Sequence, residues 1–249
     1  MIRVLLLGGT TEASQIAQLL ANAGIEAVFS YAGRTTKPVS QPIPVRVGGF
    51  GGVAGLVSYL RNAKITHVLD ATHPFAAQMS CHAIAACAET DIPLLAFERP
   101  PWKPAEGDDW RSVPDIPSAV AALPSAASRI FLAIGRQHIE IFSARPQHEY
   151  LLRLVDAPAL PLPLPQAEIV IARGPFTIEG DAALMQAHRI THVVAKNAGG
   201  VGAQAKLDAA RILGLPVILI ERPAIPPRPV ARTMKEAMAW LRHPARLGV

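Results

Sequence analysis

The stretch RVLLLGGTTEA, residues 3–13, decides the fold of this chain of 249 residues. It joins the apolar run Val4–Leu7 to a pair of glycines and then to the polar start of a helical pattern. A short apolar run is typical of a buried strand, and a strand that passes through a glycine turn into a helix is the first βα unit of an α/β fold. The run is too short for a signal-peptide core and no small-residue cleavage site follows it, so we expect a cytoplasmic protein.

The same alternation of apolar and helical segments continues along the chain. The expected strands are Arg3–Leu7, Ala27–Tyr31, Pro44–Val47, His67–Asp70, Pro93–Phe97, Arg129–Ile134, Glu149–Val155, Glu168–Ala172, His192–Ala195 and Pro216–Ile220. The expected helices are Thr11–Ala23, Gly52–Arg61, Phe75–Glu89, Glu179–His188, Ala203–Leu213 and Thr233–Arg242. Apolar strands that alternate with helices indicate parallel sheets covered on both faces. The pattern predicts an α/β protein with two Rossmann-like, doubly wound domains.

A change in composition marks the expected domain boundary. Residues 98–117 contain five prolines and two tryptophans but few periodic apolar positions, as expected for a crossover. We therefore predict an N-terminal domain over residues 1–98, a proline-rich crossover over 99–128 and a C-terminal domain over 129–249. In such folds a ligand lies outside the carboxyl ends of the strands.

Composition and charge exclude several classes of protein. Lys and Arg number 24 against 19 Asp and Glu, and no Lys/Arg run indicates a nucleic-acid arm. Arginine supplies 18 of the basic residues, which suits an anionic small molecule because guanidinium pairs with carboxylate or phosphate; a general arginine bias is the alternative. No window approaches the about 18 uncharged apolar residues of a membrane span. Cys81 and Cys87 form neither a redox pair nor a zinc motif, and we expect no metal site.

The first turn, made by Gly8, Gly9, Thr10 and Thr11, is a candidate binding site for cofactor phosphates. Glycines let a phosphate approach the backbone, and the start of the next helix offers unpaired N–H groups and a partial positive charge. The threonines add hydroxyl donors or a cap. The segment lacks the G-x-G-x-x-G fingerprint, so a tight turn with a threonine cap is the alternative.

Gly33 and Arg34 follow the second expected strand, where the adenosine ribose of a dinucleotide lies in this type of fold. No Asp or Glu occurs over residues 31–36 to hold the ribose hydroxyls of NADH. An arginine there suits the 2′-phosphate of NADPH, so Arg34 is the candidate for cofactor selection; a solvated surface arginine is the alternative. The glycine-rich segment 48–52 is either a second loop that approaches the ligand or a tight turn.

A polar segment, DATHPFA at residues 70–76, follows another expected strand and opens a helix at Pro74. Thr72 and His73 are candidates for contacting the cofactor there. His73 titrates near neutrality and is the one candidate for moving a proton. A capping or packing histidine is the alternative.

Three strand ends in the second half carry a cation or a flexible loop. They are Gly135-Arg136-Gln137, Arg173-Gly174-Pro175-Phe176 and Lys196-Asn197-Ala198-Gly199-Gly200. Together they predict an anion site in which Arg136, Arg173, Lys196 and Asn197 contact a substrate.

The motifs that are absent narrow the reaction class. None of the tyrosines at 31, 59 and 150 has a lysine four residues later, which argues against an epimerase or dehydratase acting on a nucleotide-bound substrate. G-x-S-x-G, P-loop and H-E-x-x-H motifs are also missing. A non-catalytic dinucleotide-sensing module remains an alternative, although ligand candidates in both halves favour a substrate beside a cofactor.

Eight segments, in order, resemble the precorrin-6A reductase family of cobalamin biosynthesis, which includes the cobalt-precorrin-6A reductases. They are GGTTEA (8–13), YAGR (31–34), GGFGG (48–52), DATHPFA (70–76), ERPPW (98–102), GRQ (135–137), ARGPF (172–176) and AKNAGG (195–200). The resemblance implies two Rossmann-like domains and an NADPH-dependent oxidoreductase that acts on a CH–CH bond. It implies hydride transfer that reduces the C18–C19 double bond of precorrin-6A to give precorrin-6B.

The substrate that the resemblance implies is a tetrapyrrole with many carboxylates, which agrees with the arginine-rich strand ends. The cofactor carries the hydride and the conjugated macrocycle delocalises charge, so no side-chain acid is required and we assign no catalytic residue beyond the candidate His73. The resemblance leaves open whether the macrocycle is metal-free or holds cobalt. The oligomeric state and the hydride face also stay open.

Overall fold

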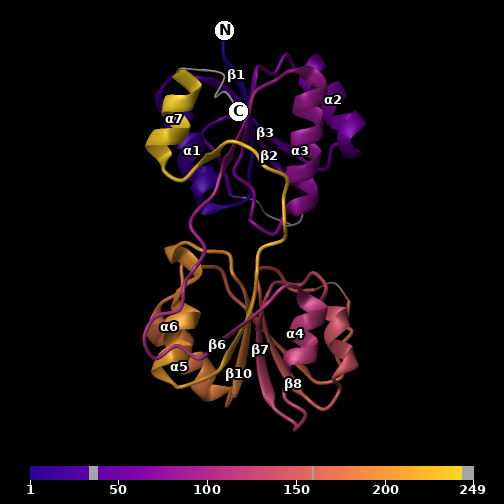
Figure 1. The fold of residues 1–249 in the computed structure, drawn as a ribbon, viewed down its shortest axis with the longest axis vertical. Helices are drawn as coiled ribbons and strands as arrows, with labels where there is room; N and C mark the ends of the chain where they lie inside the picture. The colour runs from indigo at the N-terminus through magenta and orange to yellow at the C-terminus, as the bar shows by residue number, and fades with distance from the viewer. Residues whose placement is uncertain (34–38, 159, 243–249) are drawn as a thin grey trace. The chain divides into compact units, whose positions relative to one another are not determined.

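The computed structural model describes residues 1–33, 39–158 and 160–242. The chain forms two compact units, of which the first contains residues 1–99 and the chain from 224 onward, and the second residues 100–223. In Figure 1 the yellow helix α7 (Met234–Arg242) accordingly lies among the indigo and purple elements of the first unit. Each unit has a six-stranded sheet flanked by helices, which confirms the predicted fold class.

The sheet of the first unit has the strand order β12-β5-β4-β1-β2-β3, and its pairings are parallel. Its strands are β1 (Arg3–Leu7), β2 (Glu26–Tyr31), β3 (Val45–Val47), β4 (His67–Asp70), β5 (Leu94–Phe97) and β12 (Val230–Ala231). Leu7 of β1 pairs with Ser30 of β2 and with Asp70 of β4. The turns after β1, β2 and β4 therefore meet at one end of the sheet.

Helices cover both faces of this sheet, and this explains why β1 is apolar at successive positions. Leu5 and Leu7 pack in one cluster with α2 and α3, whereas Val4 and Leu6 pack in another with α1 and α7. The helices that provide these faces are α1 (Thr11–Asn22), α2 (Gly52–Asn62), α3 (Ala77–Thr90) and α7. Helix α1 buries Ala13, Ile16, Ala17 and Leu20, the spacing of one helical face.

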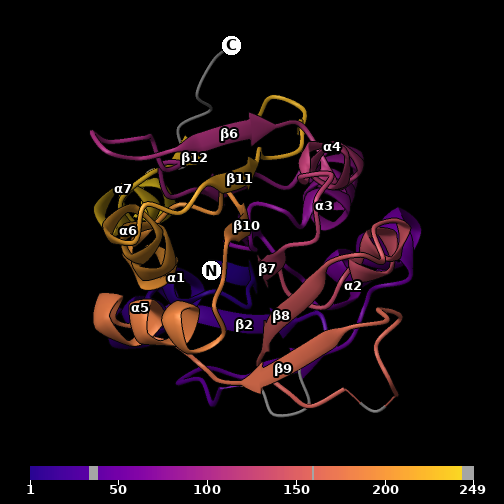
Figure 2. The ribbon, with the colours of Figure 1, turned by 90° about the horizontal axis from the view of Figure 1, so that it is seen from below.

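The sheet of the second unit has the order β6-β11-β10-β7-β8-β9, again with parallel pairings. Its strands are β6 (Trp110–Val113), β7 (Arg129–Ala133), β8 (Glu149–Leu154), β9 (Ala167–Ile171), β10 (His192–Lys196) and β11 (Val217–Ile220). Figure 2 shows α5 and α6 on one side of this sheet and α4 on the other. The helical segments are α4 (Ile116–Ala122), α5 (Ile178–Ala187), α6 (Ala205–Ile212) and the 3-10 turns η1 (Ile139–Ala144) and η2 (Val201–Ala203).

The predicted strands and helices all occur, with ends shifted by at most two residues, but the unit boundaries differ from the predicted domains. The chain after residue 223 returns to the first unit, where β12 pairs with β5 and α7 packs in the α1 cluster. The segment expected as a crossover supplies β6, which pairs with β11, and then α4. β12 thus covers the edge of β5, and β6 covers the edge of β11. Without these strands, the backbone N–H and C=O groups along both edges would be unpaired.

In the described ranges, none of the helices combines the length and the apolar character that crossing a membrane requires.

Candidate functional site

The strand orders place the candidate sites at the carboxyl ends of β1 and β4 in the first unit and of β7 and β10 in the second. The chain connects β1 outward to β2 and β3 on one side, while β4, β5 and β12 lie on the other. Such a reversal opens a crevice where α/β proteins bind ligands. The second unit repeats this arrangement around β7. Strands β8 and β9 lie on one side of β7, and strands β10, β11 and β6 lie on its other side.

The turn after β1 has the geometry of a phosphate cradle. Gly9 has φ +120, and among the residues that the structure describes no atom lies within 4 Å of a Cβ built on it, so the backbone there is open to a ligand. Gly8 is required for packing instead, because a Cβ there lies 2.2 Å from Cζ of Phe29. In the part of the chain that the structure describes, the N–H groups of Thr11 and Glu12 at the start of α1 donate no hydrogen bond. These features fit an anionic group such as a dinucleotide phosphate.

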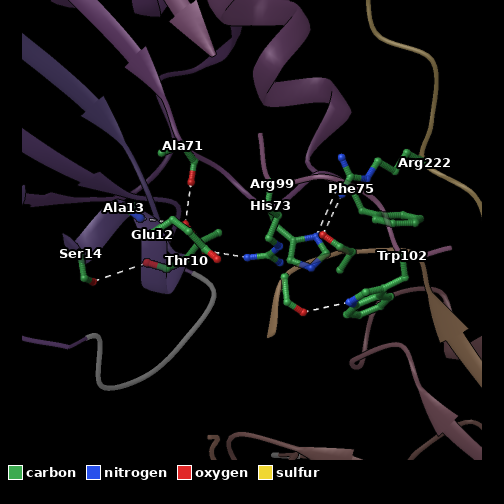
Figure 3. A network of polar contacts seen from close by, with 12 residues as sticks. Thr10, Glu12, Ala13, Ser14, Ala71, His73, Phe75, Arg99, Trp102 and Arg222 are labelled. Carbon is green, nitrogen blue, oxygen red and sulfur yellow. Dashed lines mark hydrogen bonds and ion pairs between the residues drawn. The ribbon is translucent and has the colours of Figure 1, made fainter. Parts of the chain in front are cut away.

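Thr10 fixes this turn and joins it to the next one. Its side-chain oxygen caps α1 by accepting a hydrogen bond from the N–H of Ala13 at 3.1 Å. The same hydroxyl donates to the carbonyl oxygen of Ala71, which follows β4, at 2.8 Å (Figure 3). Thr10 is therefore a structural cap as well as a candidate ligand.

Asp70 shapes the turn after β4. It is buried, and its Oδ1 accepts hydrogen bonds from the N–H and the hydroxyl of Thr72 at 3.1 and 2.6 Å, while Oδ2 accepts from Ser80 at 2.5 Å. His73 is exposed, and its Nδ1 accepts a hydrogen bond from the N–H of Phe75 at 3.2 Å. A neutral His73 therefore carries its proton on Nε2.

Glu12 and Arg99 form an ion pair at the same end of the sheet, which the sequence did not predict. Nη1 of Arg99 lies 2.6 Å from Oε2 of Glu12, with only 17% and 21% of the two side chains exposed. The pair is drawn in Figure 3. Glu12 lies in the segment GGTTEA and Arg99 in ERPPW, but 87 positions separate them, so no local pattern could pair them. A small cleft includes both and is lined by Thr10, Glu12, Ala71, Thr72, Pro74, Phe97 and Arg99.

The glycine-rich segment 48–52 is held by Arg46, a second residue that the sequence did not predict. Its guanidinium donates to Oγ of Ser30 at 2.7 Å and to the carbonyl oxygens of Gly48 and Gly49 at 2.9 and 3.1 Å. It also lies 3.8 Å from the ring centre of Phe50. Burial lowers the pKa of the Arg46 guanidinium below its usual value.

Gly33 follows shortly after β2 and lies close to Gly48. A Cβ built on Gly33 would lie 3.6 Å from the Gly48 backbone. The segments predicted to receive the adenosine ribose and to approach the ligand are thus neighbours. Arg34 lies outside the described residues.

The predicted cations of the second unit fall into two groups. Arg136 follows β7 and Lys196 ends β10, and these strands are adjacent, so both residues flank the reversal point of the sheet. Arg173 instead follows the edge strand β9, where its Nη2 lies 3.9 Å from Oδ1 of Asp156.

Asn197 has a different role from the predicted substrate contact. It is only 2% exposed. Its Oδ1 accepts from the N–H of Trp102 at 2.8 Å, and its Nδ2 donates to the carbonyl oxygen of Trp102 at 3.2 Å and to Oε2 of Glu221 at 3.3 Å. These protein partners occupy the amide, which holds the start of the second unit in place.

Arg153 supports the loop that carries Arg173. No pattern in the sequence predicts this role for Arg153. It forms an ion pair with Asp181, and the side chains are 9% and 3% exposed. Its guanidinium lies 3.6 Å from the ring centre of Phe176. Because Phe176 belongs to the same loop as Arg173, the buried pair anchors that loop on the sheet.

Comparison with known proteins gives consistent matches along nearly the whole chain. The family model "Precorrin-6x reductase CbiJ/CobK" matches residues 3–242. A precorrin-6A reductase of Rhodobacter capsulatus is 65% identical over 97% of this chain and 96% of its own. A precorrin-6A reductase of Mycobacterium tuberculosis is 44% identical over 91% of both chains. A cobalt-precorrin-6A reductase of Priestia megaterium is 31% identical over 94% of this chain and 96% of its own.

A solved structure described as "CobK precorrin-6A reductase" superposes with a TM-score of 0.94 at 65% identity, covering 97% of this chain and 96% of that one. The likeness extends over both units and their sheets. The family resemblance drawn from the eight sequence segments is thereby confirmed, and the chain belongs to the precorrin-6x reductase CbiJ/CobK family.

Proposed function

We propose that this protein reduces precorrin-6A to precorrin-6B in cobalamin biosynthesis, by hydride transfer from NADPH to the C18–C19 double bond. The observation that carries the proposal is the 65% identity to a precorrin-6A reductase over almost the full length of both chains. The test is anaerobic addition of precorrin-6A and NADPH to the protein, followed by NADPH absorbance and by the macrocycle spectrum. NADPH consumption equal to the macrocycle reduced supports the reaction; no consumption favours a dinucleotide sensor.

The substrate is proposed to be the metal-free macrocycle. Five relatives described as precorrin-6A reductases are 43–65% identical to this chain, whereas three described as cobalt-precorrin-6A reductases are 28–31% identical. A competition assay with both substrates tests this choice. A higher kcat/KM for the cobalt form would reverse it.

The turn after β1 is proposed to hold the cofactor. NADPH supplies a hydride when it is bound. The open backbone at Gly9 and the N–H groups of Thr11 and Glu12 support phosphate binding at this turn. The preference for NADPH over NADH is supported by Arg34 and by the lack of any Asp or Glu over residues 31–36.

The second unit is proposed to bind the substrate carboxylates. Arg136 and Lys196 flank one reversal point, and Arg173 lies on a loop that Arg153 anchors. Guanidinium and ammonium groups pair with carboxylates through charge-assisted hydrogen bonds.

Reduction of the double bond adds one hydride and one proton to the macrocycle. His73 is proposed to hold that proton at Nε2, because its Nδ1 already accepts from Phe75. We also propose that the reaction takes place in the cytoplasm, in keeping with the free thiols of Cys81 and Cys87.

A further inference from the structure

The tripeptide Glu-Arg-Pro occurs twice, at residues 98–100 and 221–223, each time where the chain passes from one unit to the other. The first copy follows β5 and the second follows β11, which occupy equivalent fifth positions in their sheets. The two places where the chain leaves a unit therefore have the same sequence and the same position in the fold.

The glutamates of the two copies bind the sixth strand of their own sheet. The N–H of Glu98 donates to the carbonyl oxygen of Ala231 in β12 at 3.0 Å, and the N–H of Glu221 donates to that of Val113 in β6 at 2.8 Å. The Glu98 side chain pairs with Arg228, next to β12. The Glu221 side chain accepts from Ser112 of β6 at 2.8 Å.

The arginines of the two copies bind turns at the reversal point of their own sheet. Arg99 pairs with Glu12 in the first turn of α1, after β1. Arg222 donates from Nε to the carbonyl oxygen of Asn197 and from Nη2 to that of Ala198, each at 3.0 Å, after β10. Figure 3 shows both arginines. Each segment that leaves a unit is thus tied to that unit's own candidate ligand turn.

We propose that Arg99 is a positioning residue that couples cofactor binding at the turn after β1 to the segment by which the chain leaves the first unit. This inference rests on the proposed function, which places NADPH phosphates at that turn. Glu12 belongs to the turn, and its carboxylate is mostly buried against Arg99. A phosphate held by the backbone N–H of Glu12 fixes the first turn of α1, and the ion pair between the Glu12 side chain and Arg99 carries the constraint to residues 97–103. Arg99 also balances the negative charge that Glu12 would otherwise present to the phosphates.

Hydrogen–deuterium exchange with and without saturating NADPH tests this coupling in the full chain. In the wild type, NADPH is expected to slow exchange in peptides covering residues 8–14 and also in those covering 97–103. Glu12→Gln breaks the ion pair without leaving an unpaired negative charge, and should keep the protection of 8–14 but lose that of 97–103. Arg99→Gln breaks the pair from the other side and should lose the protection of 97–103 as well.

The matched control is Glu89→Gln, which removes an exposed ion pair with Arg61 in the same unit. It should keep both regions protected. Protection of 97–103 that persists in Glu12→Gln and Arg99→Gln would overturn the coupling. No protection of 8–14 in the wild type would overturn the cofactor turn itself, and the coupling with it. A steady-state readout accompanies the exchange: Glu12→Gln should lower kcat for precorrin-6A without raising the Kd of NADPH, because it removes a negative charge beside the phosphates.

Discussion

The hydroxyl of Thr10 donates a hydrogen bond to the carbonyl oxygen of Ala71 across 2.8 Å, and so connects the turn after β1 to the turn after β4. The same oxygen caps α1. One side chain therefore sets the spacing of the two turns that form the candidate cofactor site.

Replacement of Thr10 should weaken both the fold and the cofactor site. Thr10→Ala removes the cap and the link to Ala71, and loss of a cap alone costs about 0.5–2 kcal/mol. We expect a lower free energy of unfolding in urea and a higher Kd for NADPH by calorimetry. Thr10→Ser keeps both hydrogen bonds and should restore both values; a serine variant as weak as alanine would show that the hydroxyl is not responsible.

Substitutions at the two glycines of the turn should distinguish an effect on core packing, at Gly8, from an effect on cofactor binding, at Gly9. Gly8→Ala places a Cβ within 2.2 Å of Phe29 and should mainly lower Tm. The Cβ of Gly9→Val meets no atom of the described residues within 4 Å but occupies the approach to the backbone, and the positive φ costs about 1–3 kcal/mol of strain. We expect a folded Gly9→Val protein, measured well below its Tm, to lose NADPH binding. Wild-type NADPH affinity in that variant would remove the phosphate site from this turn.

Arg34 should control the choice between cofactors. Loss of a hydrogen bond to the 2′-phosphate costs about 1.5–3 kcal/mol, so Arg34→Ala should lower kcat/KM for NADPH about 10- to 150-fold and barely change it for NADH. Arg46→Ala is the comparison, because it loosens the 48–52 loop and should affect both cofactors alike. An equal fall with both cofactors in Arg34→Ala would assign a structural role to Arg34.

Neighbouring residues 196 and 197 should behave differently. Lys196→Ala and Arg136→Ala should raise the Kd of the tetrapyrrole about 10- to 150-fold, because each removes a charged hydrogen bond. Neither change should alter the NADPH affinity, and Arg136→Ala, at an exposed position, should also keep the wild-type Tm. Asn197→Ala leaves the backbone groups of Trp102 unpaired, at about 1–3 kcal/mol each, and should lower Tm. A stable Asn197→Ala protein with poor tetrapyrrole binding would return Asn197 to the substrate site.

Acid should destabilise the protein through its buried histidines. His148 is fully buried, and burial, followed by the charge of Arg145, lowers its pKa from 6.5. Its folded form thus binds a proton less readily than its unfolded form. The stabilising contribution is present above about pH 6.5 and decreases as the pH falls below that value toward the folded pKa. Burial also lowers the pKa of His67 and His192, with the same sign.

Urea unfolding measured from pH 8 down to pH 5 checks this prediction. His148→Phe should reduce the loss of unfolding free energy over that range. His138→Asn, at an exposed position whose positive φ an asparagine tolerates, should leave the loss unchanged. A pH dependence that is the same in His148→Phe and in the wild type would assign the acid sensitivity to other groups.

Elements with their own hydrophobic pattern could be predicted from the sequence. β1 buries four successive residues and α1 buries residues at helical spacing, so the type and nearly the ends of both elements follow from the local pattern. β12 contains two residues, and only its pairing with β5 makes it a strand. No periodicity exists over so short a segment, and the proline-rich sequence around it indicates a loop.

The turns that form the candidate site could be predicted from the sequence, but the contacts between residues of different turns could not. Gly9 and Thr10 follow a strand directly, and their surroundings are local. The Glu12–Arg99 and Asn197–Trp102 contacts join residues 87 and 95 positions apart, so they depend on how the sheets bring distant turns together. Asn197 was predicted to contact a substrate because its segment follows an apolar strand and carries a cation and a flexible loop, and only the fold reveals that its amide is buried.

The return of the chain to the first unit also has a consequence for biosynthesis. A ribosome releases residues 1–99 first, yet β12 and α7 are made only after the whole of the second unit. Until then, the edge of β5 in the nascent first unit is uncovered, and the part of its core that α7 later covers is open to solvent. Of the two units, the first therefore begins earlier in translation but matures later. A premature stop near residue 224 would damage the first unit, which contains the candidate cofactor turn, rather than the second unit, whose translation would already be complete.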